Sequence, residues 1–220
     1  MKKIHLFLSV LFLLFVQINL WGQVTVTGAT GTAGPYTTLK GAFDAINAAD
    51  QSGNNIVITI TASTTETATA SLTGAGGMWT SLIIYPTATG ITISGNIAFP
   101  LVDLNGADNV TIDGRVNQTG VTDLTITNLS TLNTAGTSTI RFINDATNNT
   151  VMYCNLKGSS TGGISSGNTY TGVVLFSTST GTTGNDGNTI DNNYITSSTN
   201  VNRPTNAIAS TGSDGEENSG

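Results

Sequence analysis

Residues 149–156 read NTVMYCNL, and residues 188–195, which begin 39 positions later, read NTIDNNYI. A looser copy, DNVTIDG, occupies residues 108–114. A strand with flanking asparagines that recurs at a fixed period indicates a solenoid, in which each coil presents the same positions to its neighbours. A β-sandwich has no reason to repeat in this way. The repeat therefore predicts an all-β solenoid.

Short apolar strands separated by Gly, Asn, Asp and Ser run from residue 81 to the end of the chain, so we assign residues 81–220 to the coils. The strands are expected at 82–85, 91–93, 110–112, 124–126, 140–143, 151–156, 173–176 and 190–195. Stacking predicts one interior column of Val110, Val151 and Ile190, with Leu156 over Ile195 and Ile140 over Val173 on neighbouring faces. Turn asparagines should adopt left-handed φ and hydrogen-bond to the backbone of the next coil.

Residues 23–80 form a cap region that contains the one helical pattern of the chain. Its apolar residues have the i, i+3, i+4 and i+7 spacing of an amphipathic helix: Leu39, Ala42, Phe43 and Ile46. We place this helix at about 37–49, with Thr37 or Thr38 as its N-cap. A lone helix ahead of a long run of strands predicts a lid over the open end of the stack.

The first 22 residues have the pattern of a secretory signal peptide. Lys2 and Lys3 precede an apolar run at 6–16, and a more polar exit ends at Gly22. The run is shorter than the ~20 apolar residues of a membrane span, although a retained anchor is the alternative because Leu20 is large for a cleavage site. Cleavage would remove His5, the only histidine. We expect a secreted, extracellular or cell-surface protein with no membrane span after signal removal.

The composition excludes several classes. With 40 Thr, 23 Asn and 19 Ser but only 7 Lys plus Arg, the chain lacks the residues of a coiled coil or helical bundle. A pI near 4.4 opposes nucleic-acid binding. The β-branched clusters argue against disorder. A lone cysteine, Cys154, makes no intramolecular disulfide and is expected to be a small buried residue.

The last residues repeat an earlier stretch of the chain. The segment 205–220 is similar to 171–187, and in the earlier copy the next residues begin a strand. The repeat phase therefore leads us to expect a chain truncated at its C-terminus, because a solenoid needs a terminal cap.

Two features resemble the pectin-lyase-like right-handed parallel β-helix family. The motif at 36–46, YTTLKGAFDAI, followed by IVI at 56–58, is similar to the N-terminal cap of those proteins, and the rungs at 109–114 and 188–195 are similar to their turn-strand repeats. The resemblance covers about residues 24–220 and is strongest to large secreted, repeat-bearing surface proteins of bacteria. It implies a right-handed parallel β-helix. It leaves function open, since this fold hosts lyases, hydrolases, esterases and adhesins.

Catalytic clusters are sparse. The resemblance implies clustered aspartates with a histidine for hydrolases, and a basic residue with calcium-binding carboxylates for lyases. The weak catalytic candidates are Asp113 and Arg115, with Asp108 and Asp123 nearby in sequence; their alternative is a turn with a solvated arginine. An esterase would need two aspartates and an arginine on one face, for which the candidates are Asp103, Asp113, Asp145 and Arg141.

Metal and sugar sites rest on weaker patterns. Oxygen-rich turns suit calcium, and the weak candidates are Asp186 and Asp191, together with the acidic run Asp214, Glu216 and Glu217; no other cofactor is expected. A sugar-stacking platform would need several aromatic residues on one face, and otherwise they pack in the coil wall: Trp79, Tyr85, Tyr153, Tyr170 and Tyr194.

Regular repetition without a catalytic cluster favours a structural, adhesive or glycan-binding protein whose partner is a polysaccharide or cell-surface glycan. The alternative is a polysaccharide-active enzyme, either a lyase or a carbohydrate esterase, with its active site partly in coils beyond residue 220.

Overall fold

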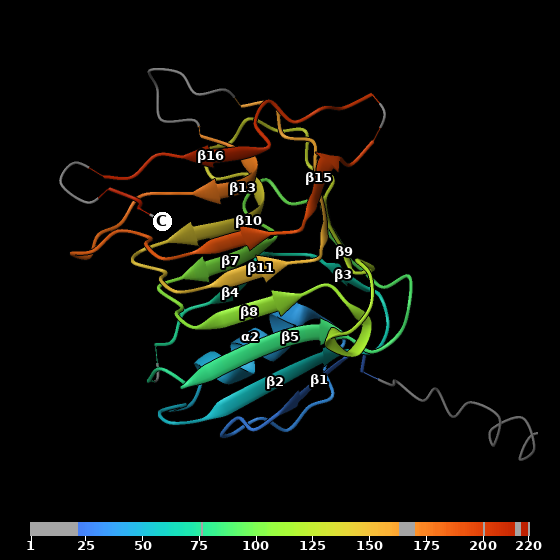
Figure 1. Cartoon of the computed structure of the whole chain (residues 1–220), viewed down its shortest axis with the longest axis vertical. Coiled ribbons are helices and arrows are strands. Elements are labelled where there is room, and N and C mark those ends of the chain that lie inside the picture. The colour runs from blue at the N-terminus through green and yellow to red at the C-terminus, as the bar shows by residue number, and fades with distance from the viewer. Residues whose placement is uncertain (1–21, 76, 163–169, 200, 214–216, 220) are drawn as a thin grey trace, which may run out of the picture.

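The computed structural model describes residues 22–75, 77–162, 170–199, 201–213 and 217–219. Its strands form three sheets, A, B and C, and the chain visits them in turn (Figure 1). Sheet A contains β1 (Val24–Thr27), β2 (Asn55–Ile60), β5 (Ser81–Pro86), β8 (Val110–Asp113), β11 (Thr150–Met152) and β14 (Thr189–Asp191). Sheet B contains β3 (Thr64–Glu66), β6 (Thr92–Gly95), β9 (Thr125–Asn128), β12 (Asn155–Gly158) and β15 (Tyr194–Ser197). Sheet C contains β4 (Ala70–Leu72), β7 (Val102–Asn105), β10 (Ser138–Ile143), β13 (Gly172–Phe176) and β16 (Ile208–Ser210).

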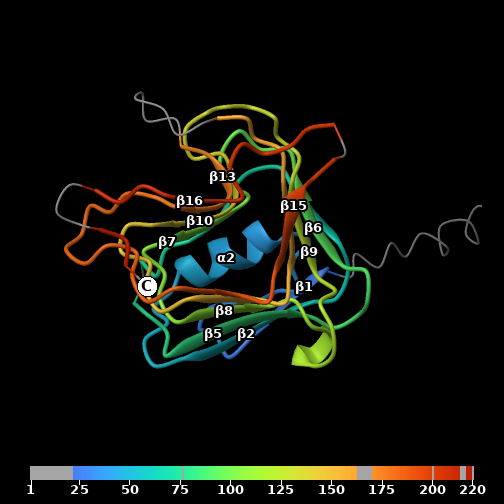
Figure 2. The ribbon, with the colours of Figure 1, turned by 45° about the horizontal axis from the view of Figure 1, so that its top comes forward.

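All pairs between successive coils are parallel, so the predicted parallel β-helix is confirmed. Seen with the C-terminal end forward, the chain runs from sheet A through B to C counter-clockwise as it approaches the viewer (Figure 2). This sense of rotation makes the β-helix right-handed, as predicted. The first coil consists of β2, β3 and β4, because β2 already pairs in parallel with β5. It therefore lies inside the segment 23–80 that we assigned to the cap.

The interior columns agree with the prediction in one place and differ in another. Leu156 lies over Ile195, as expected. Val151 pairs with Ile190 but also with Ile112, whereas Val110 pairs with Leu82, so the predicted place of Val110 in this column is wrong. A shift of two residues keeps every inward side chain inward, so apolar alternation cannot detect it.

The second correction concerns sheet C, where Ile140 pairs with Val174 and not with Val173. Both valines are fully buried. Val173 lies against Gly158 of β12, at the corner between sheets B and C. Because both faces of β13 are covered at this point, hydrophobicity alone could not indicate which valine faces the core.

The helix α2 (Leu39–Asn47) lies across the first coil and closes the N-terminal end of the core, as predicted (Figure 2). Its four apolar residues are buried, and the side chain of its N-cap, Thr38, accepts a hydrogen bond from the Gly41 amide at 3.0 Å. The buried carboxylate of Glu66 accepts bonds from the amides of Leu39 and Lys40 at 2.9 and 3.0 Å. These acceptors satisfy amides of the first helical turn and bind the helix to β3.

Two other contacts cover strand edges at this end. β1 pairs antiparallel with β2 and completes sheet A. On sheet C, the Asn47 amide donates to the Ser71 carbonyl at 2.9 Å and accepts from the Thr73 amide at 3.0 Å. The side chain thus occupies the place of a further strand, which prevents edge pairing with another chain.

Asparagine side chains link successive coils at the turns. Asn149 accepts from the Val110 amide at 2.9 Å and donates to the Ala107 carbonyl at 2.8 Å. Asn193 repeats this contact with Cys154 and Val151 at 2.9 and 2.7 Å. These asparagines bond to the backbone of the preceding coil, not of the next coil as predicted. The predicted left-handed φ is found at other turn asparagines, including Asn109, Asn148 and Asn192.

Cys154 is fully buried, as predicted, and this burial raises the pKa of its thiol. Among the residues that the structure describes, there is no helix with the length and apolar character needed to cross a membrane.

Candidate functional site

A groove of about 720 Å³ lies on the outer face of sheet C. Because side chains alternate along a strand, the residues between the core positions of β10 point outward and form the floor. This floor consists of Arg141 and Ile143, followed by Ser177 and Thr211 just beyond β13 and β16. The volume falls within the range of about 300–1,000 Å³ that is typical of small-molecule sites.

The walls of the groove are loops that precede or follow the strands of sheet C. One wall contains Ala135 and Gly136, from the connection between β9 and β10, and Tyr170, which precedes β13. The other wall contains Thr178, Gly212, Ser213 and Glu217. The corresponding connections of the first coil are shorter, so the groove exists only where the later coils carry longer loops.

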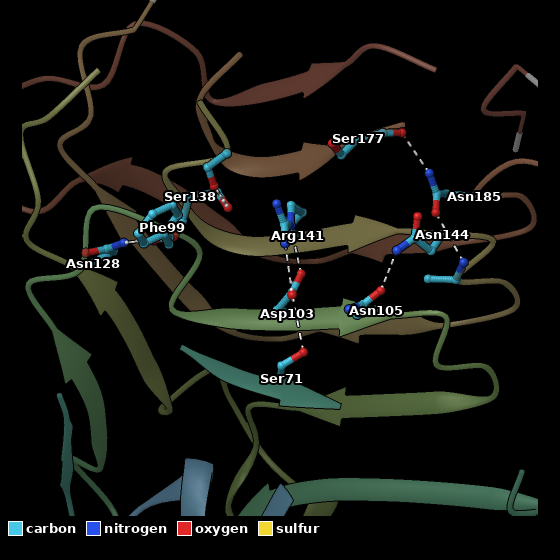
Figure 3. A network of polar contacts seen from close by, with 12 residues as sticks. Ser71, Phe99, Asp103, Asn105, Asn128, Ser138, Arg141, Asn144, Ser177 and Asn185 are labelled. Atoms are coloured by element: carbon cyan, nitrogen blue, oxygen red, sulfur yellow. Dashed lines mark hydrogen bonds and ion pairs between the residues drawn. The ribbon is translucent and has the colours of Figure 1, made fainter. Parts of the chain in front are cut away.

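Arg141 is held in the floor by a two-point ion pair with Asp103 (Figure 3). Its Nε donates to Oδ1 at 2.8 Å and its Nη2 donates to Oδ2 at 3.0 Å. Oδ2 also accepts from Ser71 at 3.3 Å, so one outward-facing ladder connects three coils. The Asp103 side chain is 5% exposed and that of Arg141 is 20% exposed. The carboxylate is therefore covered, while part of the guanidinium faces the groove.

Asp145 organises the loop that follows Thr178. Its carboxylate accepts bonds from the Ser179 hydroxyl and from the amides of Thr182 at 2.9 Å and Gly184 at 3.0 Å. Burial alone would raise the pKa of Asp145, but these hydrogen bonds outweigh it and leave the pKa below its ordinary value. The ionised carboxylate therefore stabilises the loop beside the groove.

We expect Asp145→Asn to lower the exchange protection of the Thr182 and Gly184 amides about tenfold at neutral pH, because bonds to a charged acceptor are roughly twice as strong as neutral ones. Asn tolerates the left-handed φ of 62° at this position. In the wild type, these amides should be fully protected above pH 3.9, which is about the pKa of an aspartate in the unfolded chain. Their protection should be lost as the pH falls through the lower pKa that Asp145 has in the folded protein. Amide exchange measured by NMR checks both effects. Unchanged protection in the variant, with Asp191→Asn as control, would contradict this role.

The weak catalytic candidates Asp113 and Arg115 do come together, at the turn between sheets A and B. Arg115 donates from Nε and Nη2 to the two carboxylate oxygens at 2.9 and 2.7 Å, and its guanidinium lies 4.2 Å from the centre of the Tyr153 ring. The hydrogen bond to Asp113 raises the pKa of Arg115. A general base must lose its proton, so this environment favours a permanently charged arginine.

The neighbouring acids in sequence have separate structural contacts. Asp108 accepts from the Thr147 amide at 2.7 Å and from its hydroxyl at 2.9 Å, and Asp123 accepts from the Gly90 amide at 3.0 Å. Of the esterase candidates, only Asp103 and Arg141 meet. Asp113 lies on sheet A and Asp145 lies in the turn after β10.

The two metal candidates lie at opposite ends of β14. Asp186 precedes the strand and accepts from the Ser219 amide at 2.6 Å, while Asp191 ends it and accepts from Asn192 at 2.7 Å. Asp214 and Glu216 lie outside the described residues. Within the described ranges, no three His, Cys, Asp or Glu side chains gather in a metal-binding group.

The aromatic candidates do not share one face. Trp79 is buried and donates to the Asp108 carbonyl at 2.8 Å, while Tyr85 and Tyr194 belong to sheets A and B. Tyr170 lines the groove. Sequence reasoning named Asp103 and Arg141 together as esterase candidates and Tyr170 as an aromatic candidate, but it missed the groove. The available signal was the lengthening of the Gly-, Ser- and Thr-rich stretches at 129–137 and 159–171.

A comparison with known protein families, curated proteins and solved structures finds no match to this chain.

Proposed function

We propose that this protein is a secreted or cell-surface β-helix that binds a glycan in the groove on sheet C, in a structural or adhesive role. The observation that carries this proposal is the lining of the groove, which combines a fixed guanidinium with serine and threonine hydroxyls, a carboxylate and a tyrosine. Sugar hydroxyls are both donors and acceptors, so such a mixed set can bond to them from several sides.

The rigidity of the floor also supports binding. Arg141 is fixed by Asp103, and Asp103 in turn contacts Ser71, so the donor is already oriented before a ligand arrives. Preorganised polar groups lose less conformational entropy on binding than mobile ones. A groove that is bordered by loops on a rigid scaffold is a common arrangement for recognition sites.

The cellular role rests on sequence patterns. The signal-like segment 1–22 supports secretion, and all but Gly22 lies outside the described residues. The cap and rungs that resemble pectin-lyase-like proteins, and in particular bacterial surface repeat proteins, support a cell-surface location. Both remain proposals.

The binding proposal is tested by filling the groove. Ser177→Trp places a large side chain on the floor, and we expect it to abolish binding in a screen of immobilised polysaccharides while leaving the circular dichroism spectrum unchanged. Thr189→Trp is the matched control because Thr189 is exposed on the outer face of sheet A. Binding that survives in Ser177→Trp, or that is lost equally in both variants, would contradict the placement of the site.

The alternative function is a polysaccharide-active enzyme, either a lyase or a carbohydrate esterase. Its best-supported residues are Asp113 and Arg115, which are paired and lie away from the groove. Incubation with acidic polysaccharides, followed by detection of unsaturated products, tests it. Activity that disappears in Arg115→Ala, and is also reduced in Arg115→Lys, would overturn the binding proposal in favour of a lyase.

A further inference from the structure

The charges of the groove limit which glycans it can bind. Among the described residues that line the groove, Arg141 is the one cation. Its charge is compensated by the two-point ion pair with Asp103. Glu217 adds a negative charge on the wall, and it makes no ion pair with any residue in the described ranges. The whole chain also carries a formal net charge of -6.

From these charges we infer that the groove binds a neutral oligosaccharide and discriminates against uronate polymers. This inference rests on the proposed function and specifies its substrate class. Each sugar of a uronate polymer carries a carboxylate, which would meet Glu217 and would compete with Asp103 for the guanidinium. Like charges at close range are a common means of rejecting a ligand.

A neutral sugar suits the donors that remain. A guanidinium has five N–H groups, and Asp103 engages Nε and Nη2 of Arg141. The remaining N–H groups can donate to a pair of adjacent sugar hydroxyls. The Glu217 carboxylate can accept from other hydroxyls, and the Tyr170 ring offers an apolar surface to the sugar ring.

The test is calorimetric titration of the full-length protein at low ionic strength, where surface charges act over the longest range. The neutral probes are xylohexaose and mannohexaose, and the acidic probe is hexagalacturonate. We expect at least one neutral probe to bind, and hexagalacturonate to bind at least about tenfold more weakly. Glu217→Gln should strengthen hexagalacturonate binding about fivefold, as befits an exposed charge, and should change neutral binding less than that.

Asp44→Asn is the matched control, because it removes the same charge from an exposed site on α2. It should leave the affinity for hexagalacturonate unchanged. Hexagalacturonate that binds as tightly as the neutral probes, or an equal effect of Asp44→Asn and Glu217→Gln, would overturn the inference while leaving glycan binding intact. Failure of every probe to bind would overturn the inference together with the proposed function.

Discussion

Replacing Asn149 with alanine is expected to lower the free energy of unfolding by about 2–6 kcal/mol, because two buried backbone groups lose their partners at about 1–3 kcal/mol each. Those groups are the Val110 amide and the Ala107 carbonyl, which belong to the preceding coil. Asn149 itself is fully buried, so its amide replaces bulk water as the partner of these groups in the folded protein. Urea denaturation followed by circular dichroism measures the change.

The matched control is Asn133→Ala, at an exposed asparagine in the loop between β9 and β10. It should change the free energy of unfolding by less than about 0.5 kcal/mol, as surface substitutions usually do. A loss below about 1 kcal/mol in Asn149→Ala would show that the asparagine bonds contribute little to joining the coils.

Phe142→Ala is expected to cost about 3–5 kcal/mol of stability, the usual range for truncating a buried phenylalanine. Phe142 is fully buried in the interior column of sheet C, between Leu104 and Phe176. Its ring stacks on that of Phe176 with centroids 4.7 Å apart and an interplanar angle of 9°. The substitution would leave a cavity and remove this stacking contact, and thermal or urea denaturation would measure the loss.

Phe99→Ala serves as the control for this second substitution, since Phe99 is 55% exposed. It should have little effect on the denaturation midpoint. If the two variants were equally stable, the stacked interior column of sheet C would contribute little to the stability of the protein.

The sequence predicted the architecture because the solenoid is a local pattern. Inward apolar residues and turn asparagines recur at a nearly fixed period, so the coils could be placed by spacing. The helix was predicted at about 37–49 with Thr37 or Thr38 as its N-cap, and it is found at Leu39–Asn47 with Thr38 as its N-cap. The register between the strands was harder to predict. The predicted column of Val110 and Val151 placed Asn109 two positions away from its true equivalent, Asn148, which has the same φ of 56°. Thr111 pairs with Thr150. Val110, the residue before Thr111, is therefore the equivalent of Asn149 in the preceding coil.

The groove could not be predicted in the same way because it depends on contacts across coils. Asp103 and Arg141 are 38 residues apart and meet only because β7 and β10 are neighbours in the same sheet. Asp113 and Arg115, by contrast, are close in sequence and were easy to single out. Closeness in sequence identified a structural ion pair, while the surface with the features of a binding site was built by loops from several coils.

The most direct test of the central claim is amide hydrogen exchange with and without a glycan that binds. Sugar in the groove on sheet C should slow exchange in the backbone of residues 135–143, 170–178 and 211–213, which form its floor and walls. Sheets A and B should exchange as before. Protection confined to the outer face of sheet A or B, with the sheet C segments unchanged under saturating glycan, would show that the binding site lies elsewhere.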